Sequence, residues 1–363
     1  MSELFEIRSS LGNYGIRIGA GLADTIYCRN DDFLIVSDAG LVRHWPQLAH
    51  PRNISIPAEE EAKTLDTVAK VIEQMRHLGA NRQTRMVAIG GGIVQDIATF
   101  CASTYMRGIE WSYYPTTLLG MVDSCIGGKS SINVGQYKNI AGNYCPPQEI
   151  VIDTDFCRSL PLTQKIAGLC EATKICFAQC DTAFDAYLDL ARSPDPLHPD
   201  MLGQIISLSL RTKKEFVEED EFDQGVRLLL NFGHTFGHAL EGASRFGISH
   251  GVAVGLGILT ALQLSRDMGL TDGCAPRVVA LAEHIKWLLR QIPSLASTLA
   301  SVSATDALTK FKSDKKHRKA EYAAILVNQD GYLVRSSIPI SPESEARIIH
   351  AFETTKNLSV NNI

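Results

Sequence analysis

The sequence predicts an α/β protein, in which an N-terminal parallel-sheet domain, residues 1–155, is followed by a mainly α-helical C-terminal domain, residues 156–363. Two observations support this. Short apolar runs alternate with helical patterns in the first half, which is typical of parallel strands joined by crossover helices. After Phe156 the apolar residues recur mainly at helical spacing. A chain of 363 residues is long enough for two separate cores.

The elements of the first half follow in order. Apolar runs that end at turn residues predict strands at 33–36, 86–89 and 111–114. Amphipathic or apolar helical patterns between them predict helices at 58–77 and 94–104. Each predicted strand is therefore separated from the next by a helix, as a parallel sheet requires.

The second half contains one exception to its helical pattern. Residues 321–327 and 332–334 are expected to form a hairpin about Asp330-Gly331, a strong turn signal. Helices are predicted for the remaining patterned segments, at 162–190, 201–219, 227–246, 251–268, 277–291 and 341–354.

Composition excludes several classes of function. The net charge is -5, which argues against a nucleic-acid or anionic-membrane partner, although a local basic pocket for a small anion is compatible with it. The most apolar stretch, 251–264, is too short to span a bilayer. The nine cysteines lack paired metal-type spacing. We therefore expect reduced thiols and a cytoplasmic protein.

A glycine-rich turn joins the strand at 86–89 to the next helix. Gly90, Gly91 and Gly92 would let the backbone approach a pyrophosphate at the helix N-terminus, although a structural turn would have the same pattern. Asp38 ends an earlier strand, where it would accept hydrogen bonds from a ribose or cap the turn that follows.

Three histidines and one glutamate form the clearest candidate for a metal site. His234 and His238 are four residues apart, so they share one helix face, and His250 begins the next apolar helix. Glu171, in an apolar helix, is a plausible oxygen ligand. The alternative is a set of core histidines with backbone partners, but three histidines with a buried glutamate favour a metal.

A set of cations beside turn residues suggests a polyanionic substrate. Lys129 follows Gly127-Gly128, where a backbone anion site is plausible, and Lys174 lies one turn after Glu171. Each cation alone would equally be a solvated surface charge. The other members of the set are Lys138 with Asn139, Lys213, Arg227 and the Lys315-Lys316 pair.

Taken in order from about Asp38 to Lys316, these segments closely resemble the 3-dehydroquinate synthase family of sugar phosphate cyclases. The most specific stretches are Tyr105-Met106-Arg107-Gly108, Pro115-Thr116-Thr117-Leu118-Leu119, Val122-Asp123-Ser124, Gly127-Gly128-Lys129, Lys138-Asn139, Gly168-Leu169-Cys170-Glu171 with Lys174, and 230–238 with His250-Gly251. The resemblance implies a Rossmann-like N-terminal domain, a helical C-terminal domain and a homodimer.

The resemblance also implies roles for individual residues. Glu171, His234 and His250 would bind zinc, cobalt or a similar divalent ion. The positions that match NAD-binding residues are Asp38, Glu60, Lys63, Gly91, Gly92, Asp96, Thr116, Thr117 and Phe156. The positions that match catalytic or substrate-contacting residues are Asp123, Lys129, Lys138, Asn139, Lys174, Lys213, Arg227, Asn231, His238 and one lysine of the 315–316 pair, for which we take Lys316. Arg107 matches an arginine that reaches the substrate phosphate across the dimer interface.

The implied reaction is that of a carbon–oxygen lyase acting on 3-deoxy-D-arabino-heptulosonate 7-phosphate. A bound metal acidifies neighbouring substrate hydroxyls, and NAD+ takes up a hydride that is later returned. The ketone formed acidifies the adjacent C–H, so phosphate leaves, stabilised by lysines and arginine. Ring opening and an intramolecular aldol closure then yield 3-dehydroquinate. His238 is the candidate proton shuttle.

Three departures from the family pattern leave the substrate open. Gln95 and Val252 stand where the family commonly has Gly and Glu, and the loop 129–133 differs from the usual Lys-Thr-Gly-Val-Asn. Val252 removes a plausible carboxylate partner for His250. Relatives cyclise sedoheptulose 7-phosphate or glucose 6-phosphate, while Lys213 and Arg227 favour a carboxylate-bearing substrate. A metal-dependent polyol dehydrogenase and a non-catalytic binding protein are the remaining alternatives.

Overall fold

The computed structural model describes residues 3–28, 31–135, 137–179, 181–314, 317 and 319–360. The chain forms two compact units, and each is described by itself. Unit 1 comprises Met1–Leu160 and Ser193–Glu221, and unit 2 comprises Pro161–Arg192 and Phe222–Ile363. The sequence placed one boundary at residue 155, whereas in the structure the segment 193–221 packs with unit 1.

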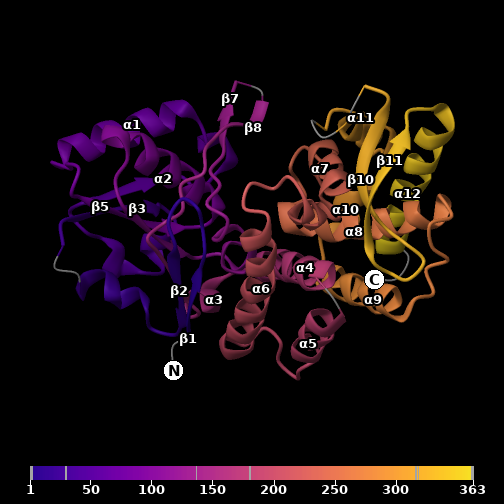
Figure 1. Ribbon diagram of the computed structural model, residues 1–363, viewed down its shortest axis with the longest axis horizontal. Coiled ribbons are helices and arrows are strands. Elements are labelled where there is room, and N and C mark those ends of the chain that lie inside the picture. Colours follow the sequence, from indigo (N-terminus) through magenta and orange to yellow (C-terminus); the bar gives the residue numbers. More distant parts are fainter. Residues whose placement is uncertain are drawn as a thin grey trace. The chain divides into compact units, whose positions relative to one another are not determined.

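Unit 1 is built on a seven-stranded sheet with the order β1-β2-β9-β6-β5-β3-β4. Strands β1, β2, β3 and β5 of this sheet are labelled in Figure 1. Only β1 pairs antiparallel, with β2, and every other pairing is parallel. The central strands are buried on both faces, which explains their continuous apolar runs. The strands span Glu3–Ile7 (β1), Tyr14–Gly19 (β2), Phe33–Asp38 (β3), Asn53–Ile56 (β4), Arg85–Gly90 (β5), Trp111–Pro115 (β6) and Glu149–Asp153 (β9).

The helices of unit 1 connect or cover these strands. They are α1 (Leu65–His77), α2 (Gly92–Thr104), α3 (Phe156–Ser159) and α6 (Pro199–Glu219), with a small hairpin of β7 (Ile132–Val134) and β8 (Tyr137–Ala141). The predicted helix 58–77 begins later, at Leu65, because the Thr64 side chain caps it by accepting a hydrogen bond from the Thr67 N–H. A 3-10 turn, η4 (Glu60–Ala62), precedes the cap.

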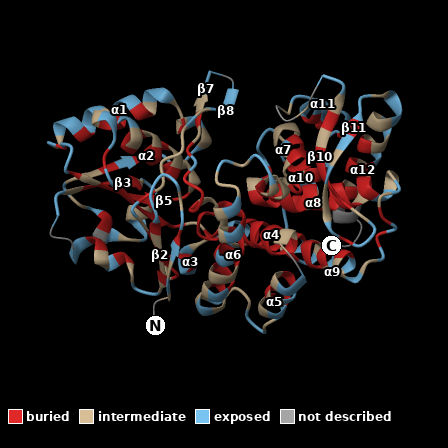
Figure 2. Cartoon of the chain, in the orientation of Figure 1, coloured by how far each residue is buried: buried red, intermediate tan, exposed pale blue. Residues whose placement is uncertain are grey.

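Unit 2 is mainly helical. Its helices are α4 (Leu162–Gln179), α5 (Asp181–Ala191), α7 (His234–Ala243), α8 (His250–Asp267), α9 (Pro276–Arg290), α10 (Leu295–Ala300), α11 (Ala304–Lys312) and α12 (Pro342–Val360). The expected hairpin is confirmed, with β10 (Glu321–Val327) antiparallel to β11 (Leu333–Pro339). Helices α4 and α8 are buried along most of their length (Figure 2), which explains their nearly continuous apolar sequence.

Two predicted helices are interrupted in the structure. The pattern at 227–246 divides into the 3-10 segment η7 (Val226–Asn231) and α7, because Gly233 takes a left-handed φ of 76°. A Cβ at Gly233 would lie 2.8 Å from the Val254 carbonyl oxygen of α8. The pattern at 162–190 divides into α4 and α5, and Asp181 in the first turn of α5 stabilises the N-terminus of that helix.

Among the described residues, no helix combines the length and the apolar composition that a membrane span requires.

Candidate active site and metal centre

A buried acid–base pair on α4 lies at the centre of the candidate metal site. Glu171 and Lys174 are one turn apart, so they share a helix face, and Lys174 Nζ lies 2.5 Å from Glu171 Oε2. Both side chains are almost completely inaccessible to solvent, at 0% and 2% exposed. Charged groups are seldom buried to this degree without a strong electrostatic reason.

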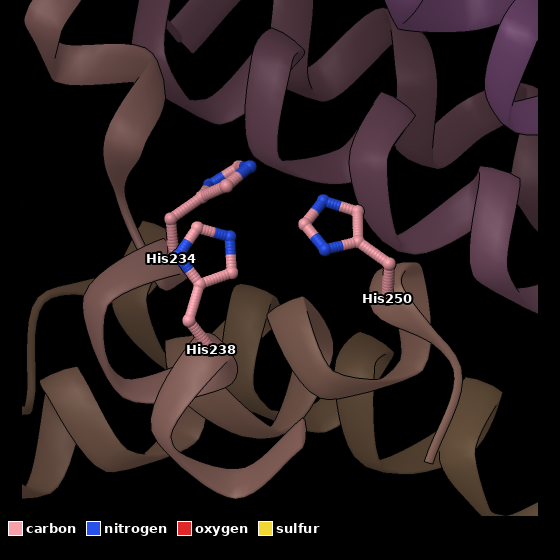
Figure 3. A group of neighbouring side chains, drawn as sticks. All are labelled: His234, His238 and His250. Atoms are coloured by element: carbon pink, nitrogen blue, oxygen red, sulfur yellow. The ribbon is translucent and has the colours of Figure 1, made fainter. Parts of the chain in front are cut away.

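Two imidazoles from other helices face this carboxylate, and a third lies beside them. His234 and His238 extend from the first two turns of α7, and His250 faces them from the first residue of α8 (Figure 3). One ligand atom of each ring lies within 4.8 Å of the others. The Nε2 atoms of His234 and His250 lie 3.6 and 3.4 Å from Glu171 Oε1. The structure therefore brings together the four residues that the sequence indicated.

The donor set fits a divalent metal. Both carboxylate oxygens of Glu171 are fully buried, and the nitrogens beside them, Lys174 Nζ and the Nε2 atoms of His234 and His250, lie at 2.5 to 3.6 Å without a well-aligned hydrogen bond. A cation bound to these oxygen atoms would compensate for the free energy that they lose on removal from water. One carboxylate with imidazoles suits zinc, cobalt and similar ions, and Glu171, His234 and His250 remain our proposed ligands.

The electrostatics of His250 agree with an anionic site. Burial of the ring would lower the pKa of His250, but the Glu171 and Glu241 carboxylates outweigh burial and raise the pKa to about 9. Without a metal, the imidazole therefore carries a positive charge at neutral pH, and a divalent cation would take over that role by displacing the Nε2 proton.

Glu241 is a residue that our sequence analysis did not identify. Its Oε2 lies 3.3 Å from His250 Nδ1. A signal was present, because residue 241 follows His238 by three positions and His234 by seven, which places all three on one face of α7. Val252, the departure noted above, is buried at 2% exposure. Glu241 thus supplies His250 with a carboxylate partner from a different helix.

The glycine-rich turn of unit 1 is tightly packed. A Cβ at Gly90 would lie 2.5 Å from Val94 Cγ2, and a Cβ at Gly91 would lie 2.8 Å from Thr117 Cγ2. The side chains of Val94 in α2 and of Thr117 after β6 therefore leave room only for glycine at these two positions. A Cβ at Gly92 would contact nothing within 4 Å, so packing does not explain that glycine. Close approach to a pyrophosphate at the N-terminus of α2 remains our prediction for it.

A second polar cluster of unit 1 joins α2 to the β7–β8 hairpin. Lys63 Nζ lies 3.0 Å from Asp96 Oδ2 and donates to Asn139 Oδ1 at 2.7 Å. Glu60 Oε1 accepts a hydrogen bond from the Asn133 amide at 2.9 Å, and Lys138 Nζ lies 3.5 Å away from the same oxygen.

Burial raises the pKa of Asp96 to about 6, although Lys63 acts in the opposite direction. Four predicted cofactor or substrate residues therefore share one network with Lys63.

Asp123 and Lys213 form a separate pair in unit 1. Lys213 on α6 lies 2.5 Å from Asp123 Oδ1, and its Nζ also donates to the Ile126 carbonyl oxygen at 3.3 Å. Asp123 lies in a π-helical turn, η6 (Gly120–Ser124). Gln95 holds this turn, since its amide donates to the Ser124 carbonyl oxygen and accepts from the Ser124 hydroxyl, both at 2.7 Å. The Gln95 departure therefore supports the backbone that carries Asp123.

Arg107 lies in an unusual backbone conformation. Met106, Arg107 and Gly108 have consecutive positive φ angles of 51°, 72° and 117°. Such angles are unfavourable for residues with a Cβ and occur most often at functional sites. The Arg107 side chain is exposed. This geometry presents a guanidinium on the surface of unit 1, and its role toward a phosphate stays a prediction.

The remaining predicted residues have varied surroundings. Asp38 accepts a hydrogen bond from the Gly40 N–H at 2.7 Å, which is the capping role that we considered as an alternative. Phe156 is 1% exposed and packs against Trp45 with ring centroids 4.6 Å apart. Lys129 is exposed, with its ammonium 6.0 Å from the centroid of the Tyr144 ring.

The other members of the predicted set come from both units. Thr116 donates its N–H to the Gly90 carbonyl oxygen at 3.0 Å, and Thr117 caps the next turn by accepting from the Gly120 N–H. In unit 2, Arg227 is buried at 5% exposure in η7, and the Asn231 amide donates to the Leu228 carbonyl oxygen. Lys316 lies outside the described residues.

Family models match most of the chain. Residues 53–167 match the 3-dehydroquinate synthase N-terminal model, and residues 168–317 match the C-terminal model. The chain is 31% identical over 363 residues to a 3-dehydroquinate synthase of Alkaliphilus metalliredigens, covering 97% of this chain and 99% of the relative. It is 37% identical over 337 residues to the enzyme of Natranaerobius thermophilus, covering 88% of this chain and 90% of the relative.

Solved structures with a similar fold include two other cyclases. A 2-deoxy-scyllo-inosose synthase complexed with carbaglucose-6-phosphate, NAD+ and Co2+ is 25% identical with a TM-score of 0.84, covering 97% of this chain and 100% of the other. The 2-epi-5-epi-valiolone synthase of Streptomyces hygroscopicus subsp. jinggangensis, with NAD+ and Zn2+ bound, is 25% identical with a TM-score of 0.77, covering 96% and 99%.

Proposed function

This chain belongs to the 3-dehydroquinate synthase family, and from that premise we propose that it converts 3-deoxy-D-arabino-heptulosonate 7-phosphate into 3-dehydroquinate and phosphate. The reaction is that of a phosphate-eliminating carbon–oxygen lyase. The observation that carries the proposal is the buried Glu171 carboxylate, which lies beside Lys174 and faces His234 and His250. Such a donor set suits a metal that binds the neighbouring hydroxyls of a sugar.

We propose NAD and one zinc or cobalt ion as the cofactors, because the two similar cyclase structures contain NAD+ with Co2+ or Zn2+. When bound, the metal supplies Lewis acidity toward the substrate hydroxyls, and the dinucleotide supplies a reversible hydride acceptor. Glu171, His234 and His250 would hold the metal. The Gly90–Gly92 turn at the N-terminus of α2, with Asp96 and Lys63 nearby, would hold the dinucleotide.

The chain's own residues account for the proton and charge movements of the proposed reaction. His238 is exposed beside the other two imidazoles, so it is placed to exchange a proton between a bound hydroxyl and solvent. Lys174 is fixed against Glu171 and contributes positive charge where a substrate anion develops. Lys213, Arg227 and Asn231 are our candidates for the substrate carboxylate, and Lys129, Lys138 and Asn139 are candidates for the phosphate end of the substrate.

We further propose a cytoplasmic homodimer, in which Arg107 of one subunit contacts the phosphate bound by its partner. The exposed, conformationally strained Arg107 supports this role, because an arginine that completed a site within its own subunit would not need to project from the surface. Mixing subunits that carry Arg107→Ala with subunits that carry His250→Ala tests the assignment. Restored activity in the mixture supports a shared site, and no restoration contradicts it.

The substrate assignment is tested by phosphate release. Purified protein, zinc or cobalt and a catalytic amount of NAD+ should release phosphate from 3-deoxy-D-arabino-heptulosonate 7-phosphate and form a carbocycle in equal amount, without net NADH. Release from sedoheptulose 7-phosphate or glucose 6-phosphate alone would replace our substrate with that sugar. Accumulation of NADH without phosphate release would identify a polyol dehydrogenase and overturn the cyclase proposal.

A further inference from the structure

The two nitrogens of the His250 ring are each matched to a different carboxylate. Nδ1 lies 3.3 Å from Glu241 Oε2, and Nε2 lies 3.4 Å from Glu171 Oε1. Glu171 comes from α4 and is completely buried, whereas Glu241 comes from α7 and is 19% exposed. The ring is therefore held between a proposed metal ligand on one side and a carboxylate outside the proposed ligand set on the other.

This arrangement determines which nitrogen can bind a metal. A neutral imidazole has one N–H donor and one lone pair, and an ionised carboxylate only accepts hydrogen bonds. When a metal replaces the Nε2 proton, the carboxylate beside Nδ1 would hold the one remaining proton on Nδ1 and leave the Nε2 lone pair for the metal. The same hydrogen bond fixes the rotation of the ring and increases the basicity of Nε2 as a ligand.

We propose that Glu241 is the positioning residue for His250 and acts on metal binding through that imidazole. The inference rests on the proposed function, because it requires the metal that Glu171, His234 and His250 would hold. In this proposal the carboxylate partner of His250 comes from α7, because residue 252 on α8 is a valine. Glu241 contacts neither substrate nor metal in this role.

The close approach of α7 to α8 makes this contact available. A Cβ at Gly237 would lie 2.7 Å from the Ala253 carbonyl oxygen, and a Cβ at Gly257 would lie 2.0 Å from the Gly233 carbonyl oxygen. Only glycine fits at these crossings, so the two helix backbones are in direct contact. Glu241, one turn after His238, consequently reaches the first residue of α8.

Zinc affinity tests the inference independently of catalysis. The full-length protein is stripped with a chelator and titrated with zinc against a chromophoric competitor. We expect Glu241→Ala to weaken zinc binding by about 10- to 100-fold, the usual effect of removing such a partner. Glu241→Gln should fall between wild type and Glu241→Ala, because its amide oxygen still accepts the Nδ1 hydrogen bond but carries no charge.

A matched carboxylate–histidine pair elsewhere in unit 2 provides the control. Asp267 Oδ2 lies 2.8 Å from His350 Nδ1, and no proposed ligand takes part in that pair. Asp267→Asn should leave zinc affinity unchanged. If Glu241→Ala does not fold, as judged by circular dichroism, the comparison of Glu241→Gln with Asp267→Asn decides the question.

A double-mutant comparison separates positioning from direct ligation. In the His250→Ala background, Glu241→Ala should cause no further loss of the residual zinc affinity, since Glu241 acts only through His250. A further loss would show that Glu241 binds the metal itself and would overturn the inference. Wild-type affinity in Glu241→Ala would overturn it as well. Failure of the wild-type protein to bind zinc would instead contradict the proposed function.

Discussion

Lys174 Nζ lies 2.5 Å from Glu171 Oε2, and both side chains are buried in α4. An ionised carboxylate in this environment raises the free energy of the folded state unless positive charge lies nearby. In the metal-free protein, Lys174 supplies that charge together with His250, whose pKa the neighbouring carboxylates raise to about 9. A metal at the same carboxylate would share this task, so the stability of unit 2 and metal binding should be linked.

Lys174→Met should therefore destabilise the metal-free protein more than the zinc-loaded protein. Loss of one partner of a buried ion pair costs about 3–5 kcal/mol, and a bound cation would offset part of that cost. Urea denaturation with chelator or with zinc measures both values. The control Lys286→Met breaks the exposed pair with Glu283 and should cost at most about 1 kcal/mol. An equal loss with and without zinc would contradict the linkage.

His250→Ala should weaken metal binding enough that dialysis removes the ion, while the fold remains. His250 supplies one of three proposed ligands at the N-terminus of α8, and its loss should reduce the catalytic rate by about a thousandfold or more. Elemental analysis after dialysis measures the metal content. His350→Ala, which removes a surface histidine, should retain both metal and activity. Full metal occupancy in His250→Ala would refute the ligand assignment.

Arg107 offers a test of the strained loop as well as of phosphate recognition. Both Arg107→Ala and Arg107→Gly should lower kcat/KM for the phosphorylated substrate, because the guanidinium is lost. The glycine variant should be more stable than the alanine variant by about 1 kcal/mol, since φ is 72° at this position. Thermal unfolding and steady-state kinetics measure the two effects. Unchanged kcat/KM would count against the phosphate role.

His284 should make unit 2 sensitive to acid. Burial lowers the pKa of His284 to about 4, with Arg192 acting in the same direction, and the ring nitrogen lies 3.0 Å from the Tyr187 hydroxyl. Because the folded-state pKa lies below the ordinary value of 6.5, the unfolded chain binds the proton more readily between these values. The contribution of the neutral His284 to the free energy of unfolding is therefore fully present above pH 6.5 and is lost as the pH falls toward 4.

This loss amounts to about 3 kcal/mol for a shift of this size. We expect His284→Gln to have a shallower decline of unfolding free energy between pH 6.5 and 4 than the wild type, whatever its stability at neutral pH. Urea denaturation at a series of pH values measures the difference in slope. Parallel pH profiles for the two proteins would refute the assignment of this proton to His284.

Most elements of regular structure were predictable because their burial is regular. The strands Phe33–Asp38, Arg85–Gly90 and Trp111–Pro115 are buried along most of their length, and this produces the continuous apolar runs that identified them. The strand Glu149–Asp153 is buried to a similar degree but was not predicted. The edge hairpin of β1 and β2 was missed, since its alternating, half-exposed residues give a weak signal. The break at Gly233 was missed because it depends on the proximity of α8, which periodicity does not report.

The sequence by itself determined the α/β order of elements, the metal-type spacing of His234 and His238, and the family resemblance, because these are local patterns of side-chain chemistry along the chain. Only the tertiary structure decided that Glu171 lies beside His234 and His250, that Glu241 of α7 approaches the other nitrogen of His250, and that Gln95 holds the turn carrying Asp123. These contacts join residues on different helices and turns. Their distances depend on how backbones pack at glycine contacts, and no spacing within one segment contains that information.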